Sequence, residues 1–320
     1  MARADLARRG LVGVDVIAAT PFHANFELDL DALQRNIHFL MENGIVAGKG
    51  LITVAGACGE GPYMKLDEQK KVIEAAVEAS EDRVPIFVGA YQNGTREVIE
   101  LLKHASEVGA AGAQVSPPFY MTPSEDEVFS HYKAINDSVD IGIEVYNTPW
   151  SSGLDMKPRL VARLAELEKV IGVKWTSDSG KNYTEVLRKF SGRLNFIDNG
   201  YNAIWAHMMG AKGMVSIIAN FAPRYELELW DLLERKDYVG ARDHMLKLNI
   251  PLYEFIADLY EQGASGEGNP WKDAMDLCGL PSGPVRLPQV PLTAQQRDRL
   301  RTILSSIGVL GREVPSLRKR

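Results

Sequence analysis

Two residues of this sequence stand out for their chemistry, because each lies at the end of a short apolar run. Lys174 ends the run of residues 171–174, and Tyr146 lies near the end of residues 141–147. Burying an ammonium ion among apolar residues is costly, so these surroundings favour the neutral amine of Lys174. A neutral amine is a nucleophile that forms a Schiff base with a ketone. A phenol close to it is able to take and return a proton, which predicts an acid–base role for Tyr146.

A glycine-rich turn, residues 56–61, supplies a third element of a possible site. Its backbone N–H groups are suited to bind a carboxylate without an arginine, which predicts substrate contacts from Ala57, Cys58 and Gly59. Each feature also has an ordinary interpretation when taken alone. Lys174 could extend from a strand end into solvent, Tyr146 could be a core tyrosine, and the turn could be a tight connection. Cys58 is interpreted as a small filler, since no histidine pairs with it in sequence.

The elements that would position these residues form a repeating pattern. Short, nearly continuous apolar segments alternate with segments whose apolar residues recur every three or four positions, as parallel strands and helices do. The predicted strands are residues 12–20, 50–56, 84–90, 112–116, 141–146, 170–174, 194–198 and 213–217. Eight such units predict an α/β fold, a closed (β/α)8 TIM barrel. An open doubly wound sheet is the competing fold, and the absence of a Rossmann glycine pattern after the first strand disfavours it.

The strand pattern stops after residue 222, and apolar residues with helical spacing follow. We therefore expect residues 1–222 to hold the barrel core strands. Residues 223–320 should form the last barrel helix and a C-terminal helical extension that is not an independent domain. In such a barrel the active site lies at the carboxyl ends of the strands. The further residues predicted to contact substrate there are Tyr120, Ser151, Thr176, Asn199, Gly200 and Val215.

Composition narrows the classes of function. The net charge is −6, which gives no basic field for nucleic acid, and no apolar stretch approaches the roughly 20 residues that cross a bilayer. Two distant cysteines argue against a disulfide scaffold and predict a cytoplasmic protein. The six histidines occur singly, and the sequence has neither a P-loop nor a Gly-x-Ser-x-Gly motif, so we expect no metal and no cofactor.

Taken together, the motifs resemble those of the dihydrodipicolinate synthase / N-acetylneuraminate lyase family of class I aldolases. They are residues 56–60, Tyr146-Asn147-x-Pro149, residues 172–174 and Asn199-Gly200. The resemblance implies that Lys174 forms a Schiff base with pyruvate or another 2-oxo acid and that Tyr146 shuttles protons. It also implies that Ala57 and Cys58 bind the carboxylate. Tyr120 would reach in from a neighbouring subunit or close a proton relay, and the protein would be a homotetramer built as a dimer of dimers.

The chain departs from the family pattern at several positions. Ala57 and Cys58 stand where the family usually has threonine or serine, so the hydroxyl contact is missing at Ala57. The synthases have an arginine for the second carboxylate of aspartate semialdehyde where this chain has residues 150–153, Trp-Ser-Ser-Gly. The sugar-acid lyases have an acidic pair where this chain has Asn202 and Ala203, although their threonine is present as Thr176. The aromatic residues near the predicted mouth, Phe119, Trp150, Trp175 and Tyr201, suggest a more apolar aldehyde.

The leading hypothesis is a Schiff-base-dependent lyase that cleaves or forms a C–C bond between a 2-oxo acid and an aldehyde, similar to dihydrodipicolinate synthase but with a different substrate. One alternative keeps the Schiff base and dehydrates, hydrates or deaminates a 2-oxo acid. Another is a non-catalytic relative that binds 2-oxo acids. The loss of a hydroxyl at Ala57 favours this last alternative, and the presence of both Lys174 and Tyr146 argues against it.

Overall fold

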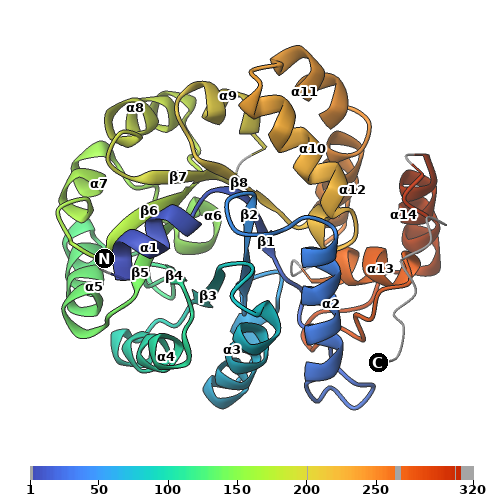
Figure 1. Cartoon of the computed structure of the whole chain (residues 1–320), viewed down its shortest axis with the longest axis horizontal. Coiled ribbons are helices and arrows are strands. Elements are labelled where there is room, and N and C mark those ends of the chain that lie inside the picture. The colour runs from blue at the N-terminus through green and yellow to red at the C-terminus, as the bar shows by residue number, and fades with distance from the viewer. Residues whose placement is uncertain (1–2, 200, 264–267, 307, 311–320) are drawn as a thin grey trace.

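Eight parallel strands close into a barrel in chain order (Figure 1). The structure is a computed structural model that describes residues 3–199, 201–263, 268–306 and 308–310. The strands are β1 Gly13–Ile17, β2 Gly50–Val54, β3 Ile86–Ala90, β4 Gly112–Val115, β5 Gly142–Asn147, β6 Val170–Trp175, β7 Asn195–Asp198 and β8 Gly213–Ser216. Because β1 pairs with both β2 and β8, the sheet has no open edge. The predicted (β/α)8 barrel is confirmed, with every predicted strand in place.

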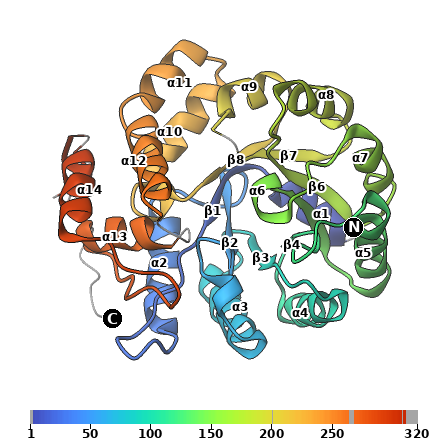
Figure 2. The same cartoon turned by 180° about the vertical axis from the view of Figure 1, so that it is seen from behind.

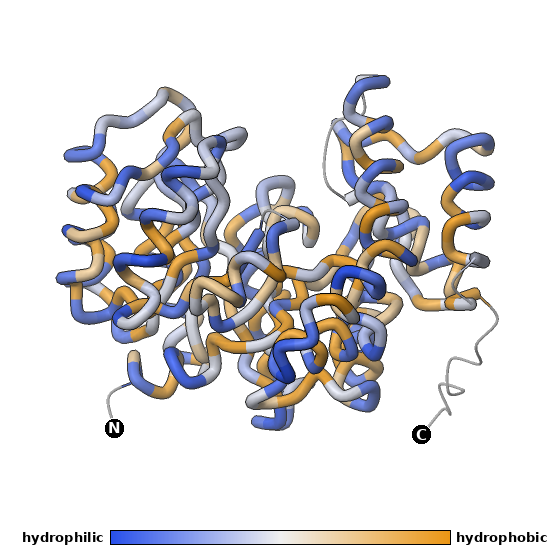
Figure 3. Tube along the Cα trace, turned by 90° about the horizontal axis from the view of Figure 1, so that it is seen from above, coloured by the Kyte–Doolittle hydropathy of each residue, from blue (hydrophilic) through white to orange (hydrophobic). Residues whose placement is uncertain are grey.

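Helices surround the strands on the outside of the barrel, as the two opposite views show (Figures 1 and 2). They are α2 Leu30–Glu42, α3 Leu66–Ser80, α4 Thr95–Val108, α5 Glu125–Ser138, α7 Pro158–Leu164, α8 Gly180–Phe190, α9 Ala203–Met208 and α10 Pro223–Glu234. Hydrophobic and hydrophilic residues alternate along these helices in Figure 3, as expected of helices that bury one face. Local sequence sets where they begin: Ser124 and Glu127 form a reciprocal capping box at the start of α5.

Three short helices lie in the connections: η1 Gly61–Tyr63, α6 Pro149–Ser152 and η2 Ile218–Asn220. Another helix, α1 Arg3–Gly10, lies across the amino end of the barrel, in front of the strands in Figure 1. Its Ala7 is 1% exposed and packs in a cluster with Leu11, Leu51, Phe87, Ile171 and Ile197. The sequence analysis predicted no helix here, because only one residue of this short, arginine-rich segment is buried.

Four further helices form the C-terminal part: α11 Tyr238–Met245, α12 Asn249–Glu261, α13 Asn269–Leu277 and α14 Ala294–Ser306. Helix α12 buries Leu252, Phe255, Ile256 and Leu259, and α14 lies at the outer edge of the molecule (Figures 1 and 2). The predicted helical extension is therefore present. That it cannot fold independently stays a prediction. None of the described helices is long and apolar enough to span a membrane.

A buried ion pair joins this extension to the barrel. Lys272 of α13 lies 2.5 Å from the Glu60 carboxylate, and the two side chains are 3% and 0% exposed. The backbone N–H of Arg286 donates to the other oxygen of Glu60 at 2.8 Å, and Lys272 donates to the carbonyl of Pro284. Because Glu60 lies within the glycine-rich turn of residues 56–61, this pair ties the extension to a loop at the barrel mouth.

We predict that Lys272→Met lowers the free energy of unfolding by about 3–5 kcal/mol, because it leaves the Glu60 carboxylate buried without its cation. Urea unfolding measures the change. The control is Arg299→Ala, which breaks an ion pair with Asp258 whose side chains are both exposed to solvent. Equal, small effects of the two variants would contradict the importance of the buried pair.

Candidate active site

Lys174 and Tyr146 lie side by side inside the barrel. The register of β5 and β6 pairs these two residues directly, so neighbouring strands present them at the same height. Lys174 is 4% exposed and Tyr146 is 6% exposed, and the lysine Nζ lies 4.7 Å from the centre of the phenol ring. The amine is therefore held away from bulk solvent against the phenol, which is the arrangement that Schiff-base chemistry needs.

The amide of Gln114 on β4 holds the lysine from below. Its Oε1 accepts a hydrogen bond from Lys174 Nζ at 3.2 Å and another from the hydroxyl of Tyr91. The Tyr91 ring stacks on Tyr146, with ring centres 5.2 Å apart. The Nε2 atom of Gln114 donates to Glu144 at 2.9 Å, so both the oxygen and the nitrogen of the Gln114 amide form hydrogen bonds. This network fixes the direction of Lys174.

Two buried carboxyl groups, Asp15 on β1 and Glu144 on β5, lie in the same barrel interior; we call them the acid pair. Both are 0% exposed, and Asp15 accepts a hydrogen bond from Thr53 at 2.7 Å. One oxygen of each, Asp15 Oδ2 and Glu144 Oε1, has no hydrogen-bond partner among the described residues. Burial raises the pKa of Asp15 to about 6, and the nearby Lys174 opposes this rise. Burial and the charge of Asp15 raise the pKa of Glu144 to about 8. Near neutral pH the acid pair therefore carries one negative charge and one proton.

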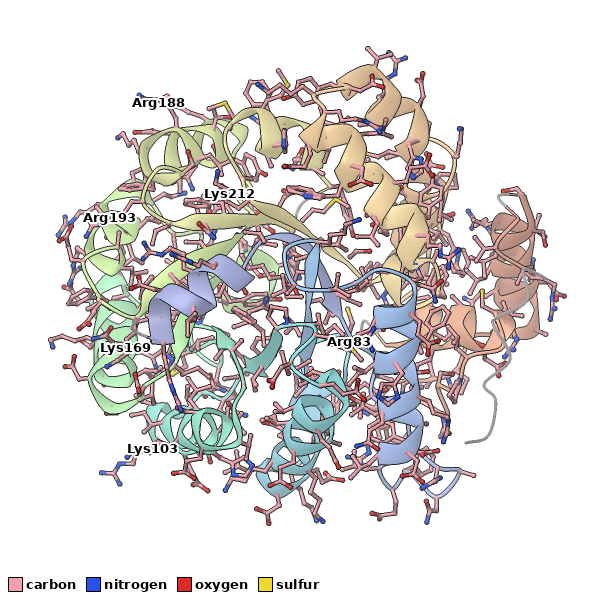
Figure 4. The ribbon with its side chains drawn as sticks, viewed as in Figure 1. Arg83, Lys103, Lys169, Arg188, Arg193 and Lys212 are labelled. Carbon is pink, nitrogen blue, oxygen red and sulfur yellow. The ribbon has the colours of Figure 1, made fainter. Side chains whose placement is uncertain are left out.

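A cavity opens above these groups at the carboxyl ends of the strands. The space in it that a water-sized sphere can reach is about 90 Å³, and the cavity is continuous with an open mouth. Among the described residues that line it, Lys174 is the one cationic side chain. Figure 4 labels other basic side chains, and four of them precede strands and so lie at the opposite, amino end: Arg83, Lys169, Arg193 and Lys212.

The sequence and the fold of this chain agree with those of known proteins. Residues 11–307 match the model of the dihydrodipicolinate synthetase family. This chain belongs to that family. The 4-hydroxy-tetrahydrodipicolinate synthase of Syntrophus aciditrophicus is 33% identical over 300 residues, which cover 93% of this chain and 99% of that protein.

Two solved structures show the same fold. The chloride-inhibited dihydrodipicolinate synthase from Acinetobacter baumannii, complexed with pyruvate, has a TM-score of 0.84 and 28% identity, over 93% of this chain and 99% of that chain. A monomeric dihydrodipicolinate synthase variant has a TM-score of 0.85 and 28% identity, over 94% and 99%. The family is one of enzymes of the class I aldolase type that act on small molecules, and the resemblance seen in the sequence is confirmed.

The cavity of this family member brings together most of the residues predicted to form the site. Its lining includes Ala57, Cys58, Tyr146, Lys174, Asn199 and Val215, together with the aromatic Trp150 and Tyr201. Carboxyl ends of six different strands, β1, β2, β5, β6, β7 and β8, contribute to it. Their roles toward a substrate stay predictions.

Four predicted contact residues do not line the cavity. Gly59 permits the close approach of the turn to β1, since a Cβ there would lie 2.5 Å from the carbonyl oxygen of Ala18. Thr176 accepts a hydrogen bond at 3.3 Å from the side chain of Asn199, which lines the cavity, whereas Ser151 donates to the Thr148 carbonyl within its own helix turn. Tyr120 is 87% exposed. Gly200, which was also predicted to contact substrate, lies outside the described residues.

Sequence reasoning missed the residues beneath Lys174. Asp15 and Gln114 are each the single polar residue of a strand, and Glu144 is a charged residue in the middle of β5. Their mutual contacts place all three in the barrel interior. Site residues were predicted only at the carboxyl ends of the strands, and these three residues lie in strand interiors. Period-two alternation would have placed Glu144 on the same face of β5 as Tyr146, which is the signal that could have found it.

We predict that the free energy of unfolding falls as the pH rises from about 5 to about 8.5. The pKa of Glu144 is raised from 4.5 to about 8 in the folded protein, so its stabilising contribution is complete below pH 4.5 and is lost as the pH passes through 8. Asp15 acts in the same direction at lower pH. Urea unfolding at several pH values should show a smaller decline for Glu144→Gln than for the wild type. The exposed control Glu42→Gln should leave the slope unchanged, and parallel curves for all three proteins would contradict the prediction.

Proposed function

We propose that this protein is a Schiff-base-dependent lyase that cleaves or forms a C–C bond between pyruvate, or a related 2-oxo acid, and an aldehyde. The observation that carries the proposal is the buried amine of Lys174, held against Tyr146 at the open end of the barrel. Family membership supports it, and so does the pyruvate complex of the Acinetobacter baumannii relative.

The proposed reaction proceeds through an iminium ion. The neutral Nζ of Lys174 attacks the ketone carbon of pyruvate, and the ketone oxygen takes up protons and leaves as water. The iminium withdraws electrons from the adjacent methyl group, which loses a proton to give an enamine. The enamine carbon attacks the aldehyde carbon, and the aldehyde oxygen gains a proton. Water then hydrolyses the iminium and frees Lys174. The reverse sequence cleaves the bond.

The surrounding residues supply the protons and the charge balance that these steps need. Tyr146 is close enough to the amine to take and return protons at the ketone oxygen and the methyl group. The negative charge of the acid pair balances the iminium, which would otherwise lie uncompensated in an apolar interior. Gln114 positions Nζ through its 3.2 Å hydrogen bond. The turn at Ala57 and Cys58 lines the cavity where the carboxylate of the 2-oxo acid would bind.

We further propose that the aldehyde is not aspartate semialdehyde, although the relatives bear the name of that synthase. The lining contains no arginine among the described residues, and Ala57 supplies no hydroxyl. Trp150 and Tyr201 line the mouth instead. A desolvated carboxylate without a bidentate partner binds poorly, whereas an apolar or aromatic aldehyde gains from these walls.

The covalent step is tested by reduction with borohydride in the presence of pyruvate, followed by peptide mass mapping. We predict a stable adduct on the peptide that contains Lys174, because the reduced iminium cannot hydrolyse. Lys174→Ala should lose the adduct and lower turnover by at least about a thousandfold. Lys189→Ala, an exposed lysine in an ion pair with Glu185, serves as the control and should label normally. Full turnover by Lys174→Ala would remove the mechanism.

Substrate preference is tested by condensation of pyruvate with a panel of aldehydes. We predict that kcat/KM for aspartate semialdehyde lies at least about tenfold below that for benzaldehyde, as expected from one missing charged hydrogen-bond partner. Product analysis by mass spectrometry distinguishes the lyase from a dehydratase, since only the lyase joins or releases an aldehyde. Efficient turnover of aspartate semialdehyde would identify a true synthase.

We also propose that the protein is cytoplasmic and forms a homotetramer. Phe119, Tyr120 and Met121 form an exposed apolar group, 38%, 87% and 78% exposed, which is suited to contact a second subunit. One structural neighbour is a monomeric variant, so the fold itself does not require assembly.

A further inference from the structure

The cavity above Lys174 continues into a second region between α10, α11 and α12. Its lining there comes from Glu226 and Leu229 of α10, Met245 of α11, and Asn249, Tyr253 and Ile256 of α12. We call this region the distal chamber. Val215 and Ile218, which also line the cavity, lie at and just after the end of β8, so one continuous space runs from the amine to the distal chamber.

Two buried side chains that are able to accept hydrogen bonds, Glu226 and Asn249, lie in the distal chamber. Glu226 and Asn249 are each 1% exposed, and Asn249 Nδ2 donates to Glu226 Oε1 at 2.9 Å. The Asn249 amide also interacts by hydrogen bond with the Tyr253 side chain, and its Oδ1 atom is buried with no hydrogen-bond partner of normal geometry among the described residues. A buried acceptor without a donor costs roughly 1–3 kcal/mol, so natural proteins rarely leave one without a purpose. This pair therefore points to a ligand that brings a donor.

The rest of the distal chamber is apolar or aromatic. Leu229, Met245 and Ile256 are buried, and Tyr253 packs against Tyr201 with ring centres 3.8 Å apart. Such walls fit a hydrocarbon or aromatic body that carries a single polar group. A sugar chain with several hydroxyl groups would leave most of them unpaired there.

Charge decides which polar group fits. A carboxylate would lie beside Glu226 with no cation of the described lining near it other than Lys174, which the 2-oxo acid occupies. An ammonium ion brings three donors, but Glu226 already accepts hydrogen bonds from Asn249 and Ser216. Burial raises the pKa of Glu226 to about 7, so this carboxyl group is partly protonated near neutral pH. A hydroxyl group both donates and accepts, and so matches Glu226 in either state.

We infer that the distal chamber binds the far end of the aldehyde substrate, and that this end is an apolar body carrying one hydroxyl group, which hydrogen-bonds to Glu226 and Asn249. This inference rests on the proposed function, since it names the substrate class for the same amine. Glu226 is then a specificity-determining residue that takes no part in the steps at Lys174.

Matched aromatic aldehydes test the inference in condensation with pyruvate. Para-(hydroxymethyl)benzaldehyde and para-ethylbenzaldehyde have nearly the same shape and differ by a hydroxyl in place of a methyl group, and para-carboxybenzaldehyde adds a charge. For the wild type we expect kcat/KM to be about 10–100-fold higher for the hydroxymethyl compound than for the ethyl compound, the range of one hydrogen bond to a charged or buried partner. The carboxylate compound should be the poorest. Equal values for all three, or preference for the carboxylate, would overturn the inference.

The variant Glu226→Leu reverses the chemistry of the distal chamber. We expect it to lose the hydroxymethyl preference and to favour the ethyl compound, while pyruvate labelling of Lys174 by borohydride is unchanged. Merely structural damage would lower both aldehydes equally, and that result would count against the inference. Should the variant not fold, Glu226→Gln, which keeps the size and a carbonyl acceptor, is expected to keep part of the preference. Absence of pyruvate labelling in the wild type would instead overturn the proposed function.

Discussion

Everything at the open end of this barrel depends on how the charge of one buried amine is balanced. Lys174 lies 4% exposed among strands whose other interior residues are mostly apolar. Asp15 and Glu144 supply the opposite charge from the same dry interior, and Gln114 links the amine to Glu144 through its two amide ends. Because the two carboxyl groups retain one proton between them, the interior accommodates a cation at Lys174 without holding two unpaired negative charges.

The barrel brings these groups together in one site because its strands set the height and the direction of each side chain. Direct pairing of Tyr146 with Lys174 across β5 and β6 sets the phenol beside the amine without a loop having to place it. Sites built on strands are held more rigidly than sites built on loops, which suits a reaction that passes through several bonded intermediates. Helices beyond the strand ends, such as α6 and α12, then line the outer part of the cavity.

The sequence was a good guide to the fold and to the strand ends. Continuous apolar runs identified the strands because parallel strands are covered on both faces, and the same runs ended at Lys174 and Tyr146. Contacts between distant segments could not be obtained this way. Gln114 matters because its amide reaches across the interior, and Glu226 matters because α10 and α12 pack so that Asn249 meets it. Sequence patterns report which face of an element is buried but not which element faces it. Helix α1 was not predicted for a related reason, since a single buried alanine leaves almost no periodic pattern in the sequence.

Helix α1 has a consequence for the chemistry at the other end of the barrel. Its Ala7 packs in one buried cluster with Leu51, Phe87 and Ile171, so α1 covers the amino end of the barrel whose interior holds Asp15 and Glu144. Trimming the chain before Leu11 would hydrate these carboxyl groups from underneath, returning them toward the acidity of free side chains. A short leading segment far from the cavity is therefore expected to influence the protonation of these two carboxyl groups.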